Sequence, residues 1–336
     1  MKIDKTAVIG AGSWGTALAI HLAKKGEQTC LWGHRQEHMK KLQQERANNR
    51  YLPGVQFPAK LHIEADLTNA VQKADCIVMA VPSHGFRRVF REILPLADDG
   101  TIFVSATKGI ELETLMSMTR IMEDETPLQR KMYFGVLSGP SFAEEVIQGE
   151  PTAVTIAFAE EAAGKVVQEL FSTDKFRAYT STDVIGVEIC GALKNIIAIG
   201  AGICEGLEYG LNARAALITR GLAEITRLGV ALGGNRHTFA GLSGLGDLLL
   251  TCTGNLSRNR TVGLKLGAGK TLEQSLQEMT MVAEGVRTTK SCYNLARSKN
   301  IEMPLLEQVY QILYEGKECQ SAVHDLFSRG LKSETC

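Results

Sequence analysis

Lys194 is the residue of this 336-residue chain that is best suited to acid–base chemistry. It lies in a predicted helical run, residues 189–198, that is otherwise almost without charge. Desolvation of an amine lowers its pKa toward neutrality, where the amine can donate or accept a proton. The alternative is a lysine at the edge of a helix whose amine reaches water. Small residues recur beside it at three- and four-residue steps, which would let another helix or a sheet approach closely: Gly191, Asn195, Ala198 and Gly202.

Asp247 and Lys108 are the next candidates. Asp247 is a lone carboxylate among the apolar residues 244–249, and it could bind substrate hydroxyls, orient Lys194 or cap a helix. Lys108 follows the apolar run 102–107, so it lies just beyond the carboxyl end of a predicted strand, where ligands gather in open α/β sheets. A solvated loop lysine is the alternative for Lys108. A second cation near Lys194 would depress the pKa of Lys194 further.

Ser257, Arg258 and Asn259 form the best candidate for an anion site. They precede a predicted helical run, 261–266, and hydroxyl, guanidinium and amide donors at the start of a helix suit a phosphate group. The 37 Lys and Arg residues balance the 37 Asp and Glu residues, so anion binding depends on local groups. Neutrality also gives no general attraction for nucleic acid or an anionic membrane. An ordinary helix cap with solvated arginines is the alternative.

Residues 10–15, GAGSWG, match the GxGxxG pattern of dinucleotide-binding turns. A strand-like run precedes them and a helical run follows to residue 25, which is the context that the pattern requires. Gly10 permits the tight turn, Gly12 lets the backbone approach a pyrophosphate, and Gly15 lets the helix pack on the sheet. The start of the helix then offers free N–H groups to the phosphates. A purely structural turn is the alternative.

The end of the second predicted strand bears on the choice of nicotinamide cofactor. NAD sites usually place Asp or Glu there to hold the ribose 2′-hydroxyl. Residues 31–35, LWGHR, contain no carboxylate, and Arg35, with His34 beside it, could neutralise a 2′-phosphate. The sequence therefore favours NADPH. If Arg35 is instead a solvated cation stacked on adenine, NADH remains acceptable.

The rest of the chain predicts two domains, a Rossmann-type α/β domain over 1–185 and an all-helical domain over 186–332. Strand-like runs in the first half are continuously apolar, which is typical of a doubly wound, mostly parallel sheet with both faces covered. These runs are 6–10, 29–33, 76–81, 102–105, 133–137 and 152–157. We expect the last one or two to run antiparallel, because a short, turn-rich segment connects them. Helical patterns then cover 184–206, 212–232, 272–278, 288–299 and 305–314.

Composition is that of a globular protein from a reducing compartment. Apolar residues make up 44% of the chain and charged residues 22%. The eight cysteines stand singly, several within apolar runs, so we expect buried thiols and a cytoplasmic location. Neither the cysteines nor the histidines have ligand spacing, so no metal site is predicted. No run reaches the roughly 18 apolar residues of a membrane helix, and we expect no signal peptide.

Motifs along nearly the whole chain resemble those of the bacterial NAD(P)-dependent sn-glycerol-3-phosphate dehydrogenase family. In order, they are GAGSWGTALA (10–19), NRYLPG (49–54), AVPS (80–83), SATKGI (105–110), LSGPSFA (137–143), GALKN (191–195), GLSGLGD (241–247), SRN (257–259) and VAEG (282–285). One small departure is Ser141, where relatives often carry Thr; the hydroxyl is kept.

The resemblance implies an enzyme that interconverts dihydroxyacetone phosphate and sn-glycerol 3-phosphate with NAD(P)H, feeds glycerophospholipid synthesis and is usually a homodimer. It makes Lys194 the proton acceptor in the oxidation direction. It places the substrate against Lys108, Gly139, Ser141, Lys194, Asp247, Ser257, Arg258 and Asn259. Together with the GxGxxG pattern and the basic residues after the second predicted strand, it places the cofactor against Gly10, Gly12, Ser13, Trp14, Gly15, His34, Arg35, Tyr51, Lys108, Ala143, Arg258, Val282 and Glu284.

Two rival functions are consistent with a dinucleotide-binding domain. Another two-domain β-hydroxyacid dehydrogenase, acting on a different phosphorylated or acidic substrate, would share the fold. The Arg258 cluster, which suits a phosphate, and the lack of an obvious second carboxylate-binding pair argue against it. A non-catalytic NAD(P)-sensing protein would need the GxGxxG pattern but not Lys194, Lys108 and Asp247 together.

Overall fold

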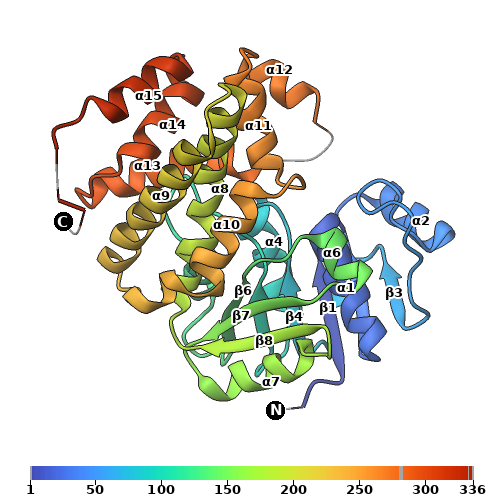
Figure 1. Ribbon diagram of the computed structural model, residues 1–336. Coiled ribbons are helices and arrows are strands. Elements are labelled where there is room, and N and C mark those ends of the chain that lie inside the picture. The colour runs from blue at the N-terminus through green and yellow to red at the C-terminus, as the bar shows by residue number, and fades with distance from the viewer. Residues whose placement is uncertain (1, 280–282, 332, 335–336) are drawn as a thin grey trace.

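The computed structural model describes residues 2–279, 283–331 and 333–334, which form a sheet flanked by helices and a bundle of helices (Figure 1). The sheet has eight strands in the order β3-β2-β1-β4-β5-β6-β7-β8. Their bounds are β1 Lys5–Ile9, β2 Gln28–Trp32, β3 Leu61–Glu64, β4 Cys76–Met79, β5 Ile102–Ser105, β6 Tyr133–Ser138, β7 Thr152–Phe158 and β8 Phe176–Ser181. Neighbouring strands run parallel except β6 and β7, which pair antiparallel. The predicted doubly wound, mostly parallel sheet is confirmed.

Two strands, β3 and β8, lie outside the six predicted runs. Both are at the edges of the sheet, where one face is less covered. Along β8, Phe176 and Ala178 are buried whereas Arg177 and Tyr179 are exposed. This alternation is expected of a strand with one solvated face. A search for continuous apolar runs therefore misses such strands.

Both faces of the central strands are buried. Consecutive side chains point to opposite sides of the sheet, so each strand contributes to two apolar clusters. Val8 and Val104 belong to one apolar cluster, whereas Ile9 and Phe103 belong to another. Four helices contribute to the first cluster: α1 Ser13–Lys25, α2 Gln36–Glu45, α6 Ala143–Gln148 and α7 Glu161–Phe171. Three contribute to the second: α3 Leu67–Val71, α4 Phe86–Ile93 and α5 Met118–Glu125.

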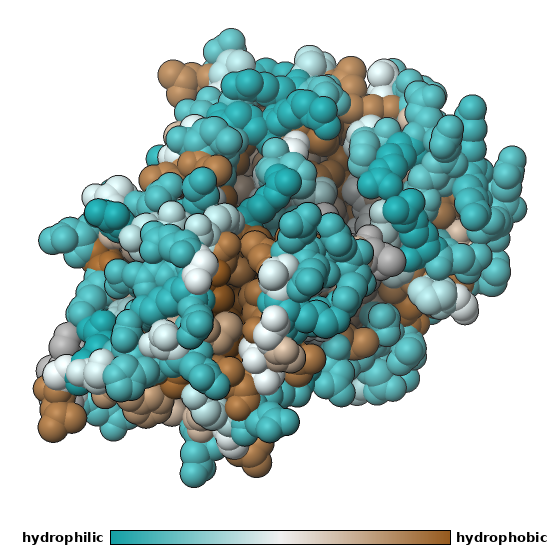
Figure 2. Space-filling view, turned by 90° about the horizontal axis from the view of Figure 1, so that it is seen from above, coloured by the Kyte–Doolittle hydropathy of each residue, from teal (hydrophilic) through white to brown (hydrophobic). Residues whose placement is uncertain are grey.

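The helical part is built around α8, Val184–Gly206, which other helices surround (Figure 1). Those helices are α9 Leu211–Ala231, α10 Asp247–Thr253, α11 Arg258–Gly267, α12 Leu272–Gln277, α13 Glu284–Ser298, α14 Pro304–Tyr314 and α15 Cys319–Phe327. In the described part of the chain α8 is the one helix long and apolar enough to cross a membrane, but 89% of its apolar window is buried inside the protein. Its composition is that of a core helix. From above, the surface is mostly hydrophilic, and apolar side chains lie in a central furrow and at a few places on the rim (Figure 2).

Helices α8 and α11 approach each other to backbone contact. A Cβ built at Gly202 on α8 would lie 2.0 Å from the carbonyl oxygen of Arg260, and one built at Gly263 on α11 would lie 2.0 Å from that of Ile199. Only glycine fits at such a distance. The small-residue stripe predicted beside Lys194 thus does bring another helix close. The contact fixes the start of α11 relative to the helix that carries the lysine.

Candidate active site

The turn between β1 and α1 has the geometry that its glycines predict. Gly10 has φ of 124°, and a Cβ there would lie 2.4 Å from the carbonyl oxygen of Ala80. A Cβ at Gly15 would lie 1.9 Å from the carbonyl oxygen of Gly10. By contrast, a Cβ at Gly12, the N-cap of α1, would meet no atom of the described residues within 4 Å. The backbone at the start of α1 therefore borders open space, and a helix N-terminus with this room fits a pyrophosphate.

Basic side chains follow β2, beside this cradle. Both His34 and Arg35 are exposed, and partial desolvation together with the charge of Arg35 lowers the pKa of His34. The Ser13 hydroxyl on α1 donates to the carbonyl oxygen of Tyr51 at 3.1 Å, which holds the loop with Tyr51 next to the cradle. The guanidinium of Arg50 lies 5.3 Å above the Tyr51 ring. The structure thus gathers a positively charged surface at this end of the cradle.

Lys194, Lys108 and Asp247 meet between the sheet and the bundle. The Lys108 amine, beyond the end of β5, donates to Asp247 Oδ2 at 2.7 Å. The Lys194 amine, from the middle of α8, donates to Asp247 Oδ1 and, at 2.8 Å, to Thr251 Oγ1. Lys194 is 6% exposed and Asp247 is 1% exposed. Lys194 is therefore not a lysine at a helix edge with its amine in water.

The protonation of this cluster depends on burial and on its own charges. Desolvation lowers the pKa of Lys194 to about 7, with the Lys108 cation acting in the same direction and the Asp247 carboxylate opposing it. Burial alone would raise the pKa of Asp247, but Lys108 and Lys194 outweigh it and hold that pKa below its usual value. Lys194 can therefore exist in both protonation states near neutral pH, beside a carboxylate that stays ionised.

Asp247 does not cap a helix, which was one of the three roles predicted for it. The N-cap of α10 is Gly246, and Asp247 is the first helical residue, with its carboxylate directed to the two lysines. Thr251, one turn later, was missed in the sequence. Its hydroxyl donates to the carbonyl oxygen of Asp247 at 2.6 Å and accepts from Lys194. The four-residue step from Asp247 was the signal that could have found it.

The start of α11 combines a helix cap with polar side chains that tie the helix to its neighbours. Ser257 is the N-cap, and its hydroxyl accepts from the Arg260 N–H at 3.3 Å, so the ordinary cap and the anion site can coexist. The Asn259 Oδ1 accepts from the Gly285 N–H at 2.9 Å, which ties α11 to the start of α13. Desolvation lowers the pKa of the neighbouring Arg258, and a nearby carboxylate, Glu284, opposes this shift.

The remaining predicted contacts lie around this junction. Gly139 has φ of 149°, and a Cβ there would lie 2.9 Å from the Cα of Val154. Glycine at this position is therefore also needed for the packing of the chain against β7. The Ser141 hydroxyl donates to the Gly139 carbonyl oxygen at 3.0 Å, and Ala143 is the first residue of α6. Glu284 accepts from the Ser83 hydroxyl at 2.7 Å, which links α13 to the turn that follows β4. The predicted contact Val282 lies outside the described residues. Over the described part of the chain, no three His, Cys, Asp or Glu side chains are grouped to hold a metal ion.

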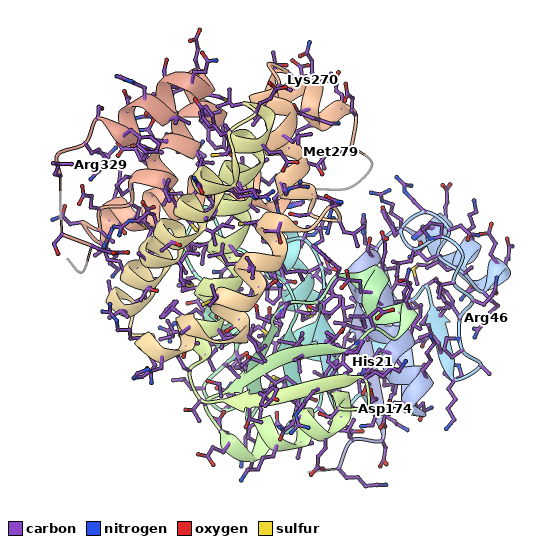
Figure 3. The ribbon with its side chains drawn as sticks, viewed as in Figure 1. His21, Arg46, Asp174, Lys270, Met279 and Arg329 are labelled. Atoms are coloured by element: carbon purple, nitrogen blue, oxygen red, sulfur yellow. The ribbon has the colours of Figure 1, made fainter. Side chains whose placement is uncertain are left out.

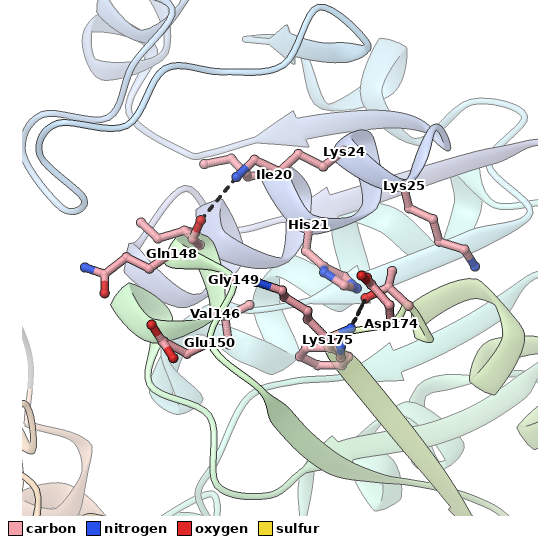
Figure 4. Close-up of a pocket in the computed structure, with 13 residues that line it drawn as sticks. Ile20, His21, Lys24, Lys25, Val146, Gln148, Gly149, Glu150, Asp174 and Lys175 are labelled. Atoms are coloured by element: carbon pink, nitrogen blue, oxygen red, sulfur yellow. Dashed lines mark hydrogen bonds between the residues drawn. The ribbon is translucent and has the colours of Figure 1, made fainter.

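A pocket of about 320 Å³ lies elsewhere, at the ends of α1 and α6 (Figure 4). In Figure 3, His21 and Asp174 mark its place in the sheet part, away from the bundle. Lys24, which lines it, donates to the Ile147 carbonyl oxygen at 3.1 Å. A cation at the carbonyl end of a helix compensates the free acceptors there. This pocket is separate from the lysine cluster.

Comparison with known proteins gives matches along nearly the whole chain. The description "NAD-dependent glycerol-3-phosphate dehydrogenase N-terminus" matches residues 5–164, and the corresponding C-terminus description matches residues 183–324. A glycerol-3-phosphate dehydrogenase (NAD(P)+) of Desulfotalea psychrophila is 57% identical over 331 residues, 98% of each chain. One of Citrifermentans bemidjiense is 52% identical over 98% of this chain and 99% of the other. The crystal structure of glycerol-3-phosphate dehydrogenase from Coxiella burnetii superposes with a TM-score of 0.94 at 42% identity, covering 97% of this chain and 99% of that one.

Proposed function

This chain belongs to the NAD-dependent glycerol-3-phosphate dehydrogenase family, and from that premise we propose how its residues perform the reaction. It is an oxidoreductase that interconverts dihydroxyacetone phosphate and sn-glycerol 3-phosphate with NAD(P)H. The observation that carries the proposed mechanism is the pair of lysine amines, that of Lys194 buried and that of Lys108 partly buried, on the two oxygens of Asp247.

The nicotinamide dinucleotide supplies the hydride when it is bound. The N–H groups of α1 above Gly12 would hold its pyrophosphate, since that space is open. Arg35 and His34 would face the adenosine ribose, and the positive charge of Arg35 supports a preference for NADPH. The other proposed contacts are Gly10, Ser13, Trp14, Gly15, Tyr51, Lys108, Ala143, Arg258, Val282 and Glu284.

Lys194 is the proposed proton donor. In the reduction direction its protonated amine gives a proton to the carbonyl oxygen of dihydroxyacetone phosphate while hydride adds to the carbonyl carbon, so the ketone becomes an alcohol. In the oxidation direction the neutral amine accepts the hydroxyl proton. A pKa of about 7 supports both roles near neutral pH. Asp247 and Thr251 accept two of its N–H groups, which leaves the third to point at substrate.

The phosphate of the substrate is proposed to bind at the start of α11, on Ser257, Arg258 and Asn259. A helix N-terminus next to a guanidinium is a favourable anion site, and a bidentate arginine contact adds specificity. The close approach of α11 to α8 supports this placement, because it sets the distance from the phosphate to Lys194. Gly139 and Ser141 would contact the substrate from the sheet side, together with Lys108 and Asp247.

We further propose a Rossmann domain over 1–185 and a substrate-binding helical domain over 186–332, with the boundary next to the start of α8. A cytoplasmic location is supported by the described cysteines, which are free thiols and, apart from Cys319, buried. A role in supplying glycerophospholipid synthesis follows from the product, sn-glycerol 3-phosphate. A homodimer is proposed from the resemblance to the family.

The substrate assignment is tested by loss of NADPH absorbance on addition of dihydroxyacetone phosphate, unphosphorylated dihydroxyacetone or a hydroxy-acid pair. We expect turnover with the first and little with the others. Arg258→Ala should raise KM for dihydroxyacetone phosphate by about 10–100-fold, the value of a charge-assisted hydrogen bond. It should change KM for unphosphorylated dihydroxyacetone little. Equal losses on both substrates would contradict a phosphate contact at Arg258.

A further inference from the structure

Glu188 on α8 is a buried carboxylate that the proposed mechanism does not use. It is 7% exposed and accepts three hydrogen bonds from the start of α5. The donors are the Ser117 hydroxyl at 2.5 Å, the Thr119 N–H at 3.0 Å and the Thr119 hydroxyl. Ser117 is the N-cap of α5, so the Thr119 N–H belongs to the first turn of that helix and has no acceptor within it. Glu188, from another part of the chain, supplies that acceptor. It joins the helix that carries Lys194 to the Rossmann part.

The segment that leads into α5 also carries Lys108. Ile110 and Ser117 form an antiparallel bridge, and the Glu111 N–H donates to the Met116 carbonyl oxygen at 2.9 Å. Residues 110–117 are therefore a closed loop, and holding Ser117 also holds the chain two residues beyond Lys108. On the other side of the loop, Arg87 donates to both oxygens of Glu111 at 2.7–3.1 Å.

The stem of Lys108 lies along the same face of α8. A Cβ built at Gly191 would lie 3.5 Å from the Cγ of Lys108 and 2.9 Å from the hydroxyl of Ser138. Glu188 and Gly191 are three residues apart, so they lie on one face of the helix. Helix α8 thus carries Lys194 and also contacts the segment with Lys108 at two points. One is the Glu188 carboxylate, and the other is the backbone at Gly191.

We infer that Glu188 is a positioning residue for the reaction, which holds the Lys108 loop so that the Lys108 amine stays on Asp247 opposite Lys194. The inference rests on the roles proposed above for Lys108 and Lys194. Without the Glu188 contacts, the loop would keep its Arg87 ion pair and the contact at Gly191 but would lose its hydrogen bonds to α8, and Lys108 would be held less firmly on Asp247. Lys194 would then lose a neighbouring cation that lowers its pKa.

Glu188→Ala tests this, with Glu224→Ala as a matched control. Glu224 is also buried, 4% exposed, and caps a helix from another element: it accepts from the Leu305 and Leu306 N–H groups of α14 at 2.8 and 3.2 Å. Both variants should lower the thermal midpoint. Only Glu188→Ala should reduce kcat/KM for dihydroxyacetone phosphate, by about 10–100-fold as expected for a misplaced active-site group. It should also move the alkaline limb of the kcat/KM profile to higher pH.

Glu188→Gln provides a second variant should the alanine protein fold poorly. It keeps one acceptor oxygen and the side-chain volume, so it should show the same changes at smaller size. In a Lys108→Ala background, Glu188→Ala should reduce kcat/KM no further, because its effect passes through Lys108. An unmoved alkaline limb in both Glu188 variants, or fully additive losses in the double variant, would overturn the inference. Lys108→Ala with wild-type kcat/KM would instead contradict the role proposed for Lys108, and the inference with it.

Discussion

Replacing Asp247 with Asn removes the negative charge between the two lysines while keeping the shape of the side chain. Asp247 is 1% exposed, and its oxygens accept from both amines. Breaking a buried ion pair by neutralising one partner costs about 3–5 kcal/mol, because the other charge is left uncompensated. Lys108 is 20% exposed and can turn to solvent, but Lys194 cannot. We therefore expect Lys194 to release its proton instead.

This release makes the stability loss depend on pH. In the wild-type protein the pKa of Lys194 is about 7 when folded and near 10.5 in the unfolded chain. Above pH 7 the Lys194 amine is neutral in the folded protein but still protonated in the unfolded chain. The free energy of unfolding therefore rises with pH by about 1.4 kcal/mol per pH unit, up to the pKa of the unfolded chain. Without the Asp247 charge, which raises the pKa of Lys194, the folded pKa is lower still. The rise in stability then begins below pH 7 in Asp247→Asn.

Urea unfolding of both proteins at pH 6, 7 and 8 measures this effect. The gap in unfolding free energy between wild type and Asp247→Asn should widen from pH 7 to pH 6. The alkaline limb of kcat/KM for dihydroxyacetone phosphate should move to lower pH, since the proton donor loses its proton earlier. A gap that stays constant from pH 6 to 8, with an unmoved limb, would refute the coupling between Asp247 and Lys194.

Three further variants test the cofactor cradle and the packing of the bundle. Gly12→Ala should keep its thermal midpoint, because the added Cβ meets open space in the described structure, but it should weaken NADPH binding measured by fluorescence titration; unchanged affinity would contradict the pyrophosphate site. Arg35→Asp should raise KM for NADPH by about 10–100-fold and change KM for NADH little, and equal changes would contradict a 2′-phosphate contact. Gly202→Ala should lower the unfolding free energy by about 1–3 kcal/mol, because its Cβ would lie 2.0 Å from the Arg260 carbonyl oxygen; an unchanged denaturation midpoint would contradict this packing.

The sequence predicts the fold where local patterns and tertiary burial agree. The bounds of α8 match its predicted run, because Asp183 caps its start through the Gly186 N–H and the apolar run fills the core of the bundle. The edge strands β3 and β8 could not be recognised from apolar runs, because their side chains alternate between buried and exposed.

The candidate site was predictable in part for a related reason. Lys194 stands out in its sequence, because an amine in an apolar helix is costly to bury. Its partner Thr251 is a common residue in a common helix and gains meaning only once Asp247 is placed. Glu188 likewise depends on the contact of α8 with the start of α5, where its partners Ser117 and Thr119 lie 71 and 69 positions away in the chain. Such contacts come from the packing of the two domains and leave no local pattern.

Steady-state turnover of Lys194→Ala with NADPH and dihydroxyacetone phosphate is the most direct test of the proposed mechanism. Loss of the general acid should reduce kcat by about 10²–10⁴-fold, while the Kd for NADPH, whose cradle lies on α1, stays near that of the wild type. A variant that turns over at nearly the wild-type rate would show that another group donates the proton.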